Sequence, residues 1–376
     1  MASFVQSEIL GTIFETTTRY TDLKAKELLL SGLLWYLLKF RITRQHAVIF
    51  RALIELWESS AYDEIRQQHV VLRKIRSPFK TRRKSREVLE EIVLLKQLQH
   101  SNLVLLSHIF VSPLDNIYLV SESSKTHLTQ IIRKGGIDNA FATYFVYQIL
   151  RGLKYLHSTG LSHCDLKPSV ILVDDHAEIK ISNIEINSPR YCPIGSRFNN
   201  HYQAPEAILA YQRADSSADI FSTGCILGEM LQGNALFAGE DLRQQLEIFR
   251  DLLGSPPEWM LEKCCDRKIC DKTFEIATDV FKPMYHDSPR VPDMSSLALF
   301  ESTDTTLVLD LLKRMLVFEP RGRLSASDAL AHSYLERYHD PTDEPICQRQ
   351  SELLVDERLP GNPWMKEIIS EVLKHN

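Results

Sequence analysis

The sequence predicts an α+β protein with a small strand-rich N-terminal part and a larger helical C-terminal part. Two β-branched runs, Val70–Ile75 and Ile117–Val120, have the composition of strands. After residue 122, long segments place apolar residues three and four positions apart, which is the period of an amphipathic helix. With 376 residues, the chain is long enough for two such parts and further extensions.

The remaining elements follow from the same patterns. Glu87–Leu98 has helical spacing and lies between the two strands, and polar Glu122–Thr126 connects the two parts. The C-terminal part begins with a long helix at Phe141–His157, followed by two short strands at Ile171–Val173 and Ile179–Ile181. Two further helices are expected at Asp219–Leu231 and Thr305–Leu316.

The composition argues against several classes of function. A formal net charge of −5 gives no reason to expect nucleic acid or an anionic membrane as a partner. Met1–Leu10 lacks a basic start, so we expect no secretory signal. The apolar run Leu28–Phe40 has about a dozen residues, whereas a membrane-spanning helix needs about twenty. Seven cysteines without framework spacing indicate reduced thiols, and the cluster at Cys264, Cys265 and Cys270 lacks a second pair of zinc ligands.

The most specific motif is His163–Leu172 (HCDLKPSVIL). It resembles the catalytic loop H-R-D-L-K-P-x-N of protein kinases, in which the Asp accepts the substrate hydroxyl proton, the Lys faces the transferring phosphate and the Asn binds magnesium. The resemblance gives Asp165 and Lys167 the first two roles. Cys164 replaces the Arg, and Val170 replaces the metal-binding Asn.

Other motifs in the expected order support the resemblance to protein kinases. Ala204-Pro205-Glu206 matches the A-P-E motif, and the resemblance implies that Glu206 pairs with Arg323. Asp219–Gly224 (DIFSTG) resembles the D-x-W-S-x-G motif. The resemblance implies that Asp219 braces the backbone of the catalytic loop. His163 is likewise expected to brace this loop by hydrogen bonding. Together the motifs imply the two-lobed protein kinase fold, with a small β-rich N-lobe and a larger α-helical C-lobe.

The chain is similar to mitogen-activated protein kinases (MAP kinases), and especially to their fungal osmotic-stress branch. The resemblance implies an N-terminal extension at 1–22, an N-lobe at 23–121, a C-lobe at 122–337 and a docking segment with a C-terminal extension at 338–376. A helix at Trp364–Leu373 is expected to pack on the N-lobe. The segments that carry this similarity are Phe14–Leu23, Phe110–Leu114, Gln148–Leu156, Met315–Pro320 and Tyr338–Pro345.

The resemblance also implies partners. In MAP kinases an acidic run after the C-lobe binds basic docking peptides of upstream MAP kinase kinases, substrates and phosphatases, and Asp340, Asp343 and Glu344 match this run. The alternative is a solvated acidic turn. The basic run Lys80–Arg86 is expected to be solvated. We further expect a monomer in the cytoplasm and the nucleus, with no nucleic-acid or membrane partner.

The expected nucleotide site departs from the family pattern. The strand lysine that binds phosphates falls at Arg73, and its partner in the family is Glu91; the alternative is that both are surface charges. Lys74 should face the other side of the strand, because strand side chains alternate. The glycine-rich loop should follow Leu23, but residues 24–60 contain a single glycine, Gly32, and therefore lack the successive glycines that let a backbone approach phosphates closely. This stretch is either a true insertion or a translated intron.

Both expected magnesium ligands are replaced. The D-F-G motif aligns with Asn183-Ile184-Glu185, so that Asn183 provides an amide where a hard cation prefers a carboxylate, and Val170 replaces the second ligand. The T-x-Y phosphorylation motif aligns with Ile194-Gly195-Ser196, which leaves Ser196 as the acceptor. Cys164 replaces the Arg that would bind an activation-loop phosphate.

Three hypotheses follow. A pseudokinase that docks to pathway partners requires only that the C-lobe folds and needs no cofactor. An active proline-directed Ser/Thr kinase would need ATP and Mg²⁺, with Asp165 as base and Lys167 beside the γ-phosphate. If residues 24–60 derive from an intron, the chain folds poorly. We favour the docking hypothesis, because an active kinase would have to bind magnesium without either usual ligand. Val170 and Asn183 lie outside residues 24–60, so they would impair the chemistry even if that stretch derives from an intron.

Overall fold

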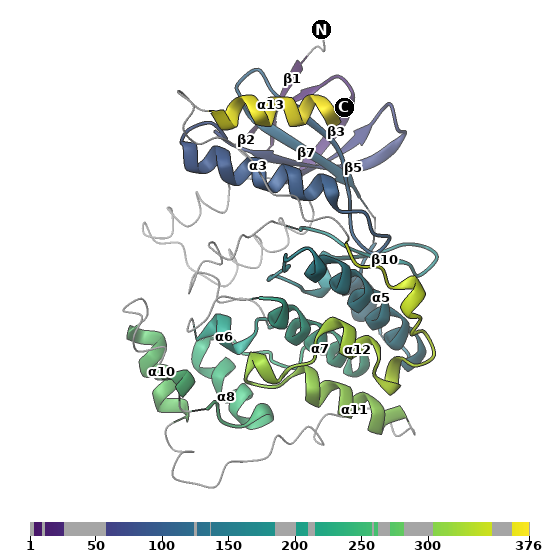
Figure 1. Ribbon diagram of the computed structural model, residues 1–376, viewed down its shortest axis with the longest axis vertical. Coiled ribbons are helices and arrows are strands. Elements are labelled where there is room, and N and C mark those ends of the chain that lie inside the picture. Colours follow the sequence, from purple (N-terminus) through teal and green to yellow (C-terminus); the bar gives the residue numbers. More distant parts are fainter. Residues whose placement is uncertain are drawn as a thin grey trace. The chain divides into compact units, whose positions relative to one another are not determined.

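The computed structural model describes residues 4–9, 12–25, 58–123, 126–135, 137–184, 201–209, 215–257, 259–261, 271–281, 304–347 and 363–375. These residues fall into two compact units (Figure 1). Unit 1 takes its residues from Met1–Gln99, Val104–Lys125 and Ser351–Asn376. Unit 2 takes its residues from His100–Leu103 and Thr126–Gln350. Unit 1 contains the large sheet and unit 2 contains most of the helices, as the predicted α+β class requires.

Unit 1 is built on a five-stranded antiparallel sheet. Its strand order is β3 (Tyr20–Ala25), β4 (Glu58–Asp63), β5 (Gln68–Ile75), β7 (Ile117–Glu122) and β6 (Leu106–Val111). A separate hairpin joins β1 (Phe4–Ile9) to β2 (Thr12–Thr17). The strands predicted within β5 and β7 are confirmed.

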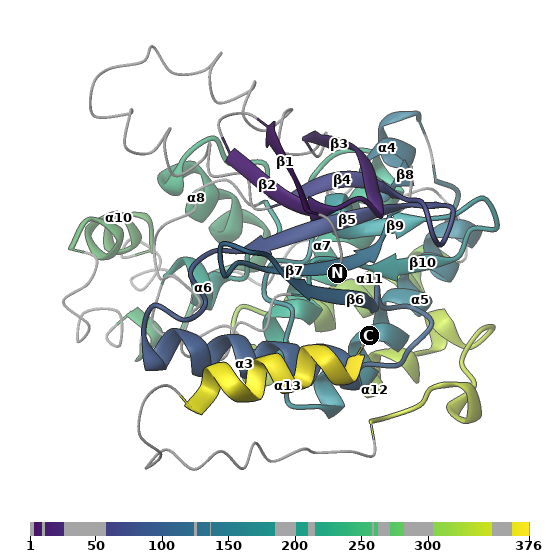
Figure 2. The ribbon, with the colours of Figure 1, turned by 90° about the horizontal axis from the view of Figure 1, so that it is seen from above.

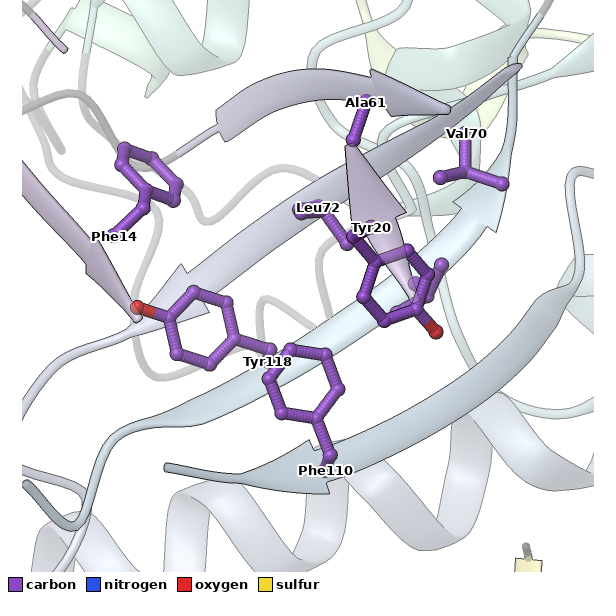
Figure 3. Packing of buried hydrophobic residues seen from close by; sticks show 8 residues of the cluster. Phe14, Tyr20, Ala61, Val70, Leu72, Phe110 and Tyr118 are labelled. Atoms are coloured by element: carbon purple, nitrogen blue, oxygen red, sulfur yellow. The ribbon is translucent and has the colours of Figure 1, made fainter. Parts of the chain in front are cut away.

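One face of this sheet carries an aromatic core. The rings of Phe110 and Tyr118 stack with centroids 4.8 Å apart, and Tyr20 stacks on Phe110 at 5.5 Å. Figure 3 shows these rings gathered beside Leu72 and Phe14. Alternate residues of β4 and β5 point into this core because strand side chains alternate between the two faces. The buried members are Phe14, Tyr20, Ala61, Val70, Leu72, Phe110, Tyr118 and Val120.

Helix α3 (Arg82–Gln97) begins five residues before the predicted helix. Thr81 caps it by accepting a hydrogen bond from the N–H of Lys84 at 3.1 Å. The basic run therefore forms the first turns of α3, where Arg83 pairs with Glu87 four residues later. Apolar Val88, Leu89, Ile92 and Leu95 are buried, as the three-to-four spacing predicts.

Helix α13 (Pro363–His375) lies beside α3 in unit 1 (Figure 2). Lys96 Nζ lies 2.7 Å from Glu371 Oε2, and the guanidinium of Arg86 lies 5.7 Å from the ring centroid of Trp364. The helix expected at Trp364–Leu373 is thus present, and it packs on the helix that carries Glu91.

Unit 2 is mainly helical. Its long central helices are α5 (Asn139–Ser158) and α7 (Ser216–Gln232), and both are largely buried. A small sheet of order β10-β9-β8 comprises Ile179–Ile181, Ile171–Val173 and Thr126–His127. The predicted elements in this unit are confirmed. Further α-helices among the described residues of this unit are α4 (Leu128–Arg133), α6 (Pro205–Ile208), α8 (Leu242–Leu253), α10 (Asp271–Phe281), α11 (Asp304–Met315) and α12 (Ala326–Leu330).

Within the described ranges, no helix is both long enough and apolar enough to span a membrane. The apolar run Leu28–Phe40 and the cysteines 264, 265 and 270 lie outside those ranges.

The packing of α13 predicts a stability difference within this helix. Trp364 is 5% exposed and Ile369 is 37% exposed. Trp364→Ala should lower the free energy of unfolding by about 3 kcal/mol, because it removes a buried aromatic side chain. Ile369→Ala should cost less than about 1 kcal/mol. Urea denaturation measures both, and equal losses would contradict the packing.

Candidate active site

The backbone of the predicted catalytic loop is held by Asp219, in the first turn of α7. The Asp219 carboxylate is fully buried and accepts the N–H of His163 at 2.8 Å and the N–H of Cys164 at 2.7 Å. It also lies 2.8 Å from His157 Nε2. Cys164 has a φ of 60°, a left-handed conformation that is unfavourable for a non-glycine residue. Asp219 therefore holds a strained turn immediately before Asp165.

His163 is a second brace of this loop. The residue is 1% exposed, and its Nδ1 accepts the N–H of Asp165 at 3.3 Å. The proton of a neutral ring then lies on Nε2, which is 2.9 Å from the carbonyl oxygen of Ser182 and donates to it. Both ring nitrogens of His163 therefore take part in hydrogen bonds that hold the loop.

Asp165 and Lys167 are adjacent in space as well as in sequence. Lys167 Nζ donates to Asp165 Oδ2 at 2.7 Å, and the two side chains are 32% and 34% exposed. The expected proton acceptor and the expected phosphate-facing cation therefore form an accessible ion pair. This part of the predicted chemistry has its residues in place.

The two positions expected to bind magnesium do not fit that ion. Val170 ends a 3₁₀ turn (Pro168–Val170), is 7% exposed and has no side-chain ligand atom. Its carbonyl oxygen accepts both the N–H and the hydroxyl of Ser182 at 2.8 Å. Asn183 follows in the left-handed region with a φ of 60° and has only a neutral amide. Magnesium in phosphate-binding sites prefers carboxylates, so these two side chains are poor ligands.

Among the residues that the structure describes, no cluster of three or more His, Cys, Asp or Glu side chains is arranged to hold a metal ion. The third residue of the expected D-F-G motif, Glu185, lies outside these residues. So do the phosphorylation motif at Ile194-Gly195-Ser196 and the stretch 26–57, which includes Gly32.

In unit 1, Arg73 on β5 and Glu91 on α3 form an ion pair. Their side chains are 20% and 16% exposed, so the pair is partly shielded from water. The structure therefore joins Arg73, the residue that the resemblance assigns to phosphate binding, to Glu91, its expected partner.

Lys74 lies on the opposite face of β5, as alternation predicts. It is 6% exposed, its Nζ donates to the carbonyl oxygen of Ile13, and the rings of Phe14 and Tyr118 lie 5.9 and 5.7 Å away. Burial lowers the pKa of Lys74, while the charge of nearby Glu15 opposes this shift. Lys74 anchors the β1–β2 hairpin and does not replace Arg73.

The pair expected at the end of the activation segment is present in unit 2. Both carboxylate oxygens of Glu206 accept hydrogen bonds from Arg323 at 2.7 Å, and both side chains are fully buried. Arg323 also donates to the carbonyl oxygens of Val317, Phe318 and Ser217. Every charge of this pair is thus compensated inside the protein.

The acidic segment is only partly available to partners. Asp340 is exposed and caps the turn Pro341–Asp343, and the hydrogen bond from the Thr342 hydroxyl lowers its pKa. The side chain of Asp343 is 68% exposed and lies 2.8 Å from Arg151. Glu344 departs from the expectation, because its carboxylate is fully buried.

The partners of Glu344 explain its burial. Its carboxylate lies 2.9 Å from Lys154 Nζ and 2.7 Å from His339 Nδ1. Lys154 and Arg151 are three residues apart on α5 and both reach the acidic segment. The sequence motifs do not predict these two residues as part of the site. Their spacing is an available signal, because basic residues three positions apart share one face of a helix.

Comparison with known proteins places this geometry in context. Residues 59–335 match the family model described as the protein kinase domain. The mitogen-activated protein kinase HOG1 of Arthrobotrys oligospora is 38% identical over 380 residues, which cover 100% of this chain and 97% of that protein. HOG1 of Cryphonectria parasitica is also 38% identical, over 100% of this chain and 95% of that protein. Mitogen-activated protein kinase mpkC of Aspergillus terreus is 38% identical over 374 residues, which cover 98% of this chain and 90% of that protein.

The buried pair in unit 2 predicts a large stability effect. Glu206→Gln should lower the free energy of unfolding by about 3 kcal/mol, because Arg323 keeps a buried charge without a counter-ion. Urea denaturation measures this loss. The exposed Glu336→Gln is a matched control that should change stability by less than about 0.5 kcal/mol. A Glu206→Gln variant as stable as the control would contradict the role of the pair.

Proposed function

Because this chain belongs to the mitogen-activated protein kinases, a family of Ser/Thr protein kinases, we propose that it acts in stress signalling by docking to pathway partners, with weak or no phosphotransfer. The family match and the strand-rich and helical units agree with the predicted two-lobed protein kinase fold.

The observation that carries the proposal is the pair of replacements at Val170 and Asn183. Kinases accelerate phosphoryl transfer mainly by positioning and by charge around the phosphate, and magnesium supplies much of that charge. Val170 is apolar and buried, and Asn183 is neutral. Loss of an oriented charge of this kind typically reduces the rate about a hundredfold or more.

The interactions that hold the scaffold around these positions are present. Asp219 still holds the loop backbone, and Glu206 still pairs with Arg323. Docking requires only that this scaffold present the acidic segment. The interactions that maintain the shape of unit 2 are therefore kept where those expected to bind magnesium are not.

The docking surface that we propose consists of Asp340 and Asp343. Both carboxylates are exposed, and at neutral pH both are available as anions to a basic peptide. Basic segments of upstream MAP kinase kinases, substrates and phosphatases are the proposed partners, encountered in the cytoplasm and nucleus by a monomer. Arg151 already contacts Asp343, so a basic peptide would have to share or displace this contact.

An active proline-directed Ser/Thr kinase is the alternative, and one observation favours it. Asp165 and Lys167 are both present and accessible, and Arg73 pairs with Glu91. This alternative requires ATP and Mg²⁺ to be held without either usual side-chain ligand. We therefore place it second.

A binding experiment tests the docking proposal. Asp340→Asn combined with Asp343→Asn should weaken a basic MAP kinase kinase docking peptide by about two- to tenfold, because exposed ion pairs contribute little individually. Asn can still cap the turn, so the fold is kept. Fluorescence anisotropy with a labelled peptide measures the dissociation constant.

The matched control removes two exposed charges elsewhere in unit 2, through Asp175→Asn with Glu240→Gln. This control should bind the peptide as the unmodified chain does. An unchanged dissociation constant in the Asp340/Asp343 variant, or an equal loss in the control, would count against docking at this surface.

A further inference from the structure

The face of the sheet that carries Arg73 also carries a carboxylate on the neighbouring strand. Strands β4 and β5 pair antiparallel, and Glu58 lies directly opposite Arg73 in their register. Opposed residues of an antiparallel pair project to the same face, with Cβ atoms about 4.5–5.5 Å apart. Glu58 and Arg73 therefore share one face at close range.

Burial distinguishes this face from the aromatic core. In β4 the buried residues are Ser59, Ala61 and Asp63, and Glu58 alternates with them as a partly exposed residue. In β5, Arg73 alternates in the same way with buried Leu72 and Lys74. Figure 3 shows Ala61 and Leu72 among the core side chains. Glu58 and Arg73 thus lie away from the core, on the side where α3 provides Glu91.

Arg73 is consequently associated with two carboxylates. Glu91 on α3 pairs with its guanidinium, and Glu58 lies opposite Arg73 on the neighbouring strand β4. An arginine stays charged at any physiological pH, so Glu58 and Glu91 are both attracted to the guanidinium of Arg73. A carboxylate on the same face competes with an incoming phosphate for this guanidinium.

We propose that Glu58 is a specificity-determining residue that excludes polyphosphates, ATP included, from Arg73. The inference deepens the proposed function and rests on it: it places an obstacle to nucleotide binding in unit 1, independent of Val170 and Asn183 in unit 2. Lys74 offers no second cation on this face, because it lies buried on the other side of β5.

The test is to titrate the full chain with ATP in the presence of EDTA and to measure the dissociation constant by isothermal titration calorimetry. Without magnesium the titration reports on the anion alone. Glu58→Gln removes the charge at nearly constant volume and should tighten ATP binding about fivefold or more, as expected for one charge contact near water. Glu58→Thr, which suits a strand, should show the same gain and guards against a folding defect of one variant.

Two further variants locate the effect. In an Arg73→Met background, Glu58→Gln should give no gain, because the cation that it frees is absent. Glu87→Gln removes a carboxylate elsewhere in unit 1, where Glu87 pairs with Arg83 on α3, and should leave ATP binding unchanged. Thermal melts of every variant establish that each is folded.

The outcomes separate this inference from the proposed function. It is overturned if both Glu58 variants bind ATP no more tightly than the unmodified chain, binding undetectable in all three included. It is also overturned if the gain persists with Arg73→Met or appears with Glu87→Gln. Phosphotransfer by the unmodified chain with Mg²⁺ would instead sink the proposed function, whatever the Glu58 variants do.

Discussion

The buried carboxylate of Asp219 is the group on which the shape of the catalytic loop depends. It accepts the N–H groups of His163 and Cys164 and lies within hydrogen-bonding distance of His157. A buried carboxylate needs such partners, and the strained φ of Cys164 needs a compensating interaction. The turn therefore keeps its conformation although Cys164 replaces the expected Arg. In this protein Asp219 therefore holds the loop without an arginine at position 164.

In each unit, residues that keep the expected family interactions lie near positions that depart from the family pattern. In unit 1, Arg73 and Glu91 keep the expected ion pair, while Glu58 adds a carboxylate on the same face. In unit 2, Asp165 and Lys167 are in place, while Val170 and Asn183 give magnesium no carboxylate. In both units the interactions that stabilise the fold are present, whereas the side chains at the two expected magnesium positions carry no carboxylate.

The sequence predicts much of this structure because its signals are local. Alternation places Lys74 opposite Arg73, and helical spacing locates α5 and α7 to within a few residues. Strand β4 is different: its sequence, ESSAYD, is largely polar, and its conformation depends on pairing with β5. The position of Glu58 opposite Arg73 follows from that pairing register, which no local pattern specifies. The burial of Glu344 likewise depends on Lys154, which is 190 residues away in sequence.

The most direct test of the central claim is the thermal unfolding of the purified chain with ATP, in the presence and absence of magnesium. A ligand at a hundred times its dissociation constant stabilises a protein by about 2.7 kcal/mol, which a melt detects readily. The account predicts a cooperative transition whose midpoint does not rise when magnesium and ATP are added together. A magnesium-dependent rise in the midpoint would contradict it, because it would show that metal and nucleotide bind without the usual ligands.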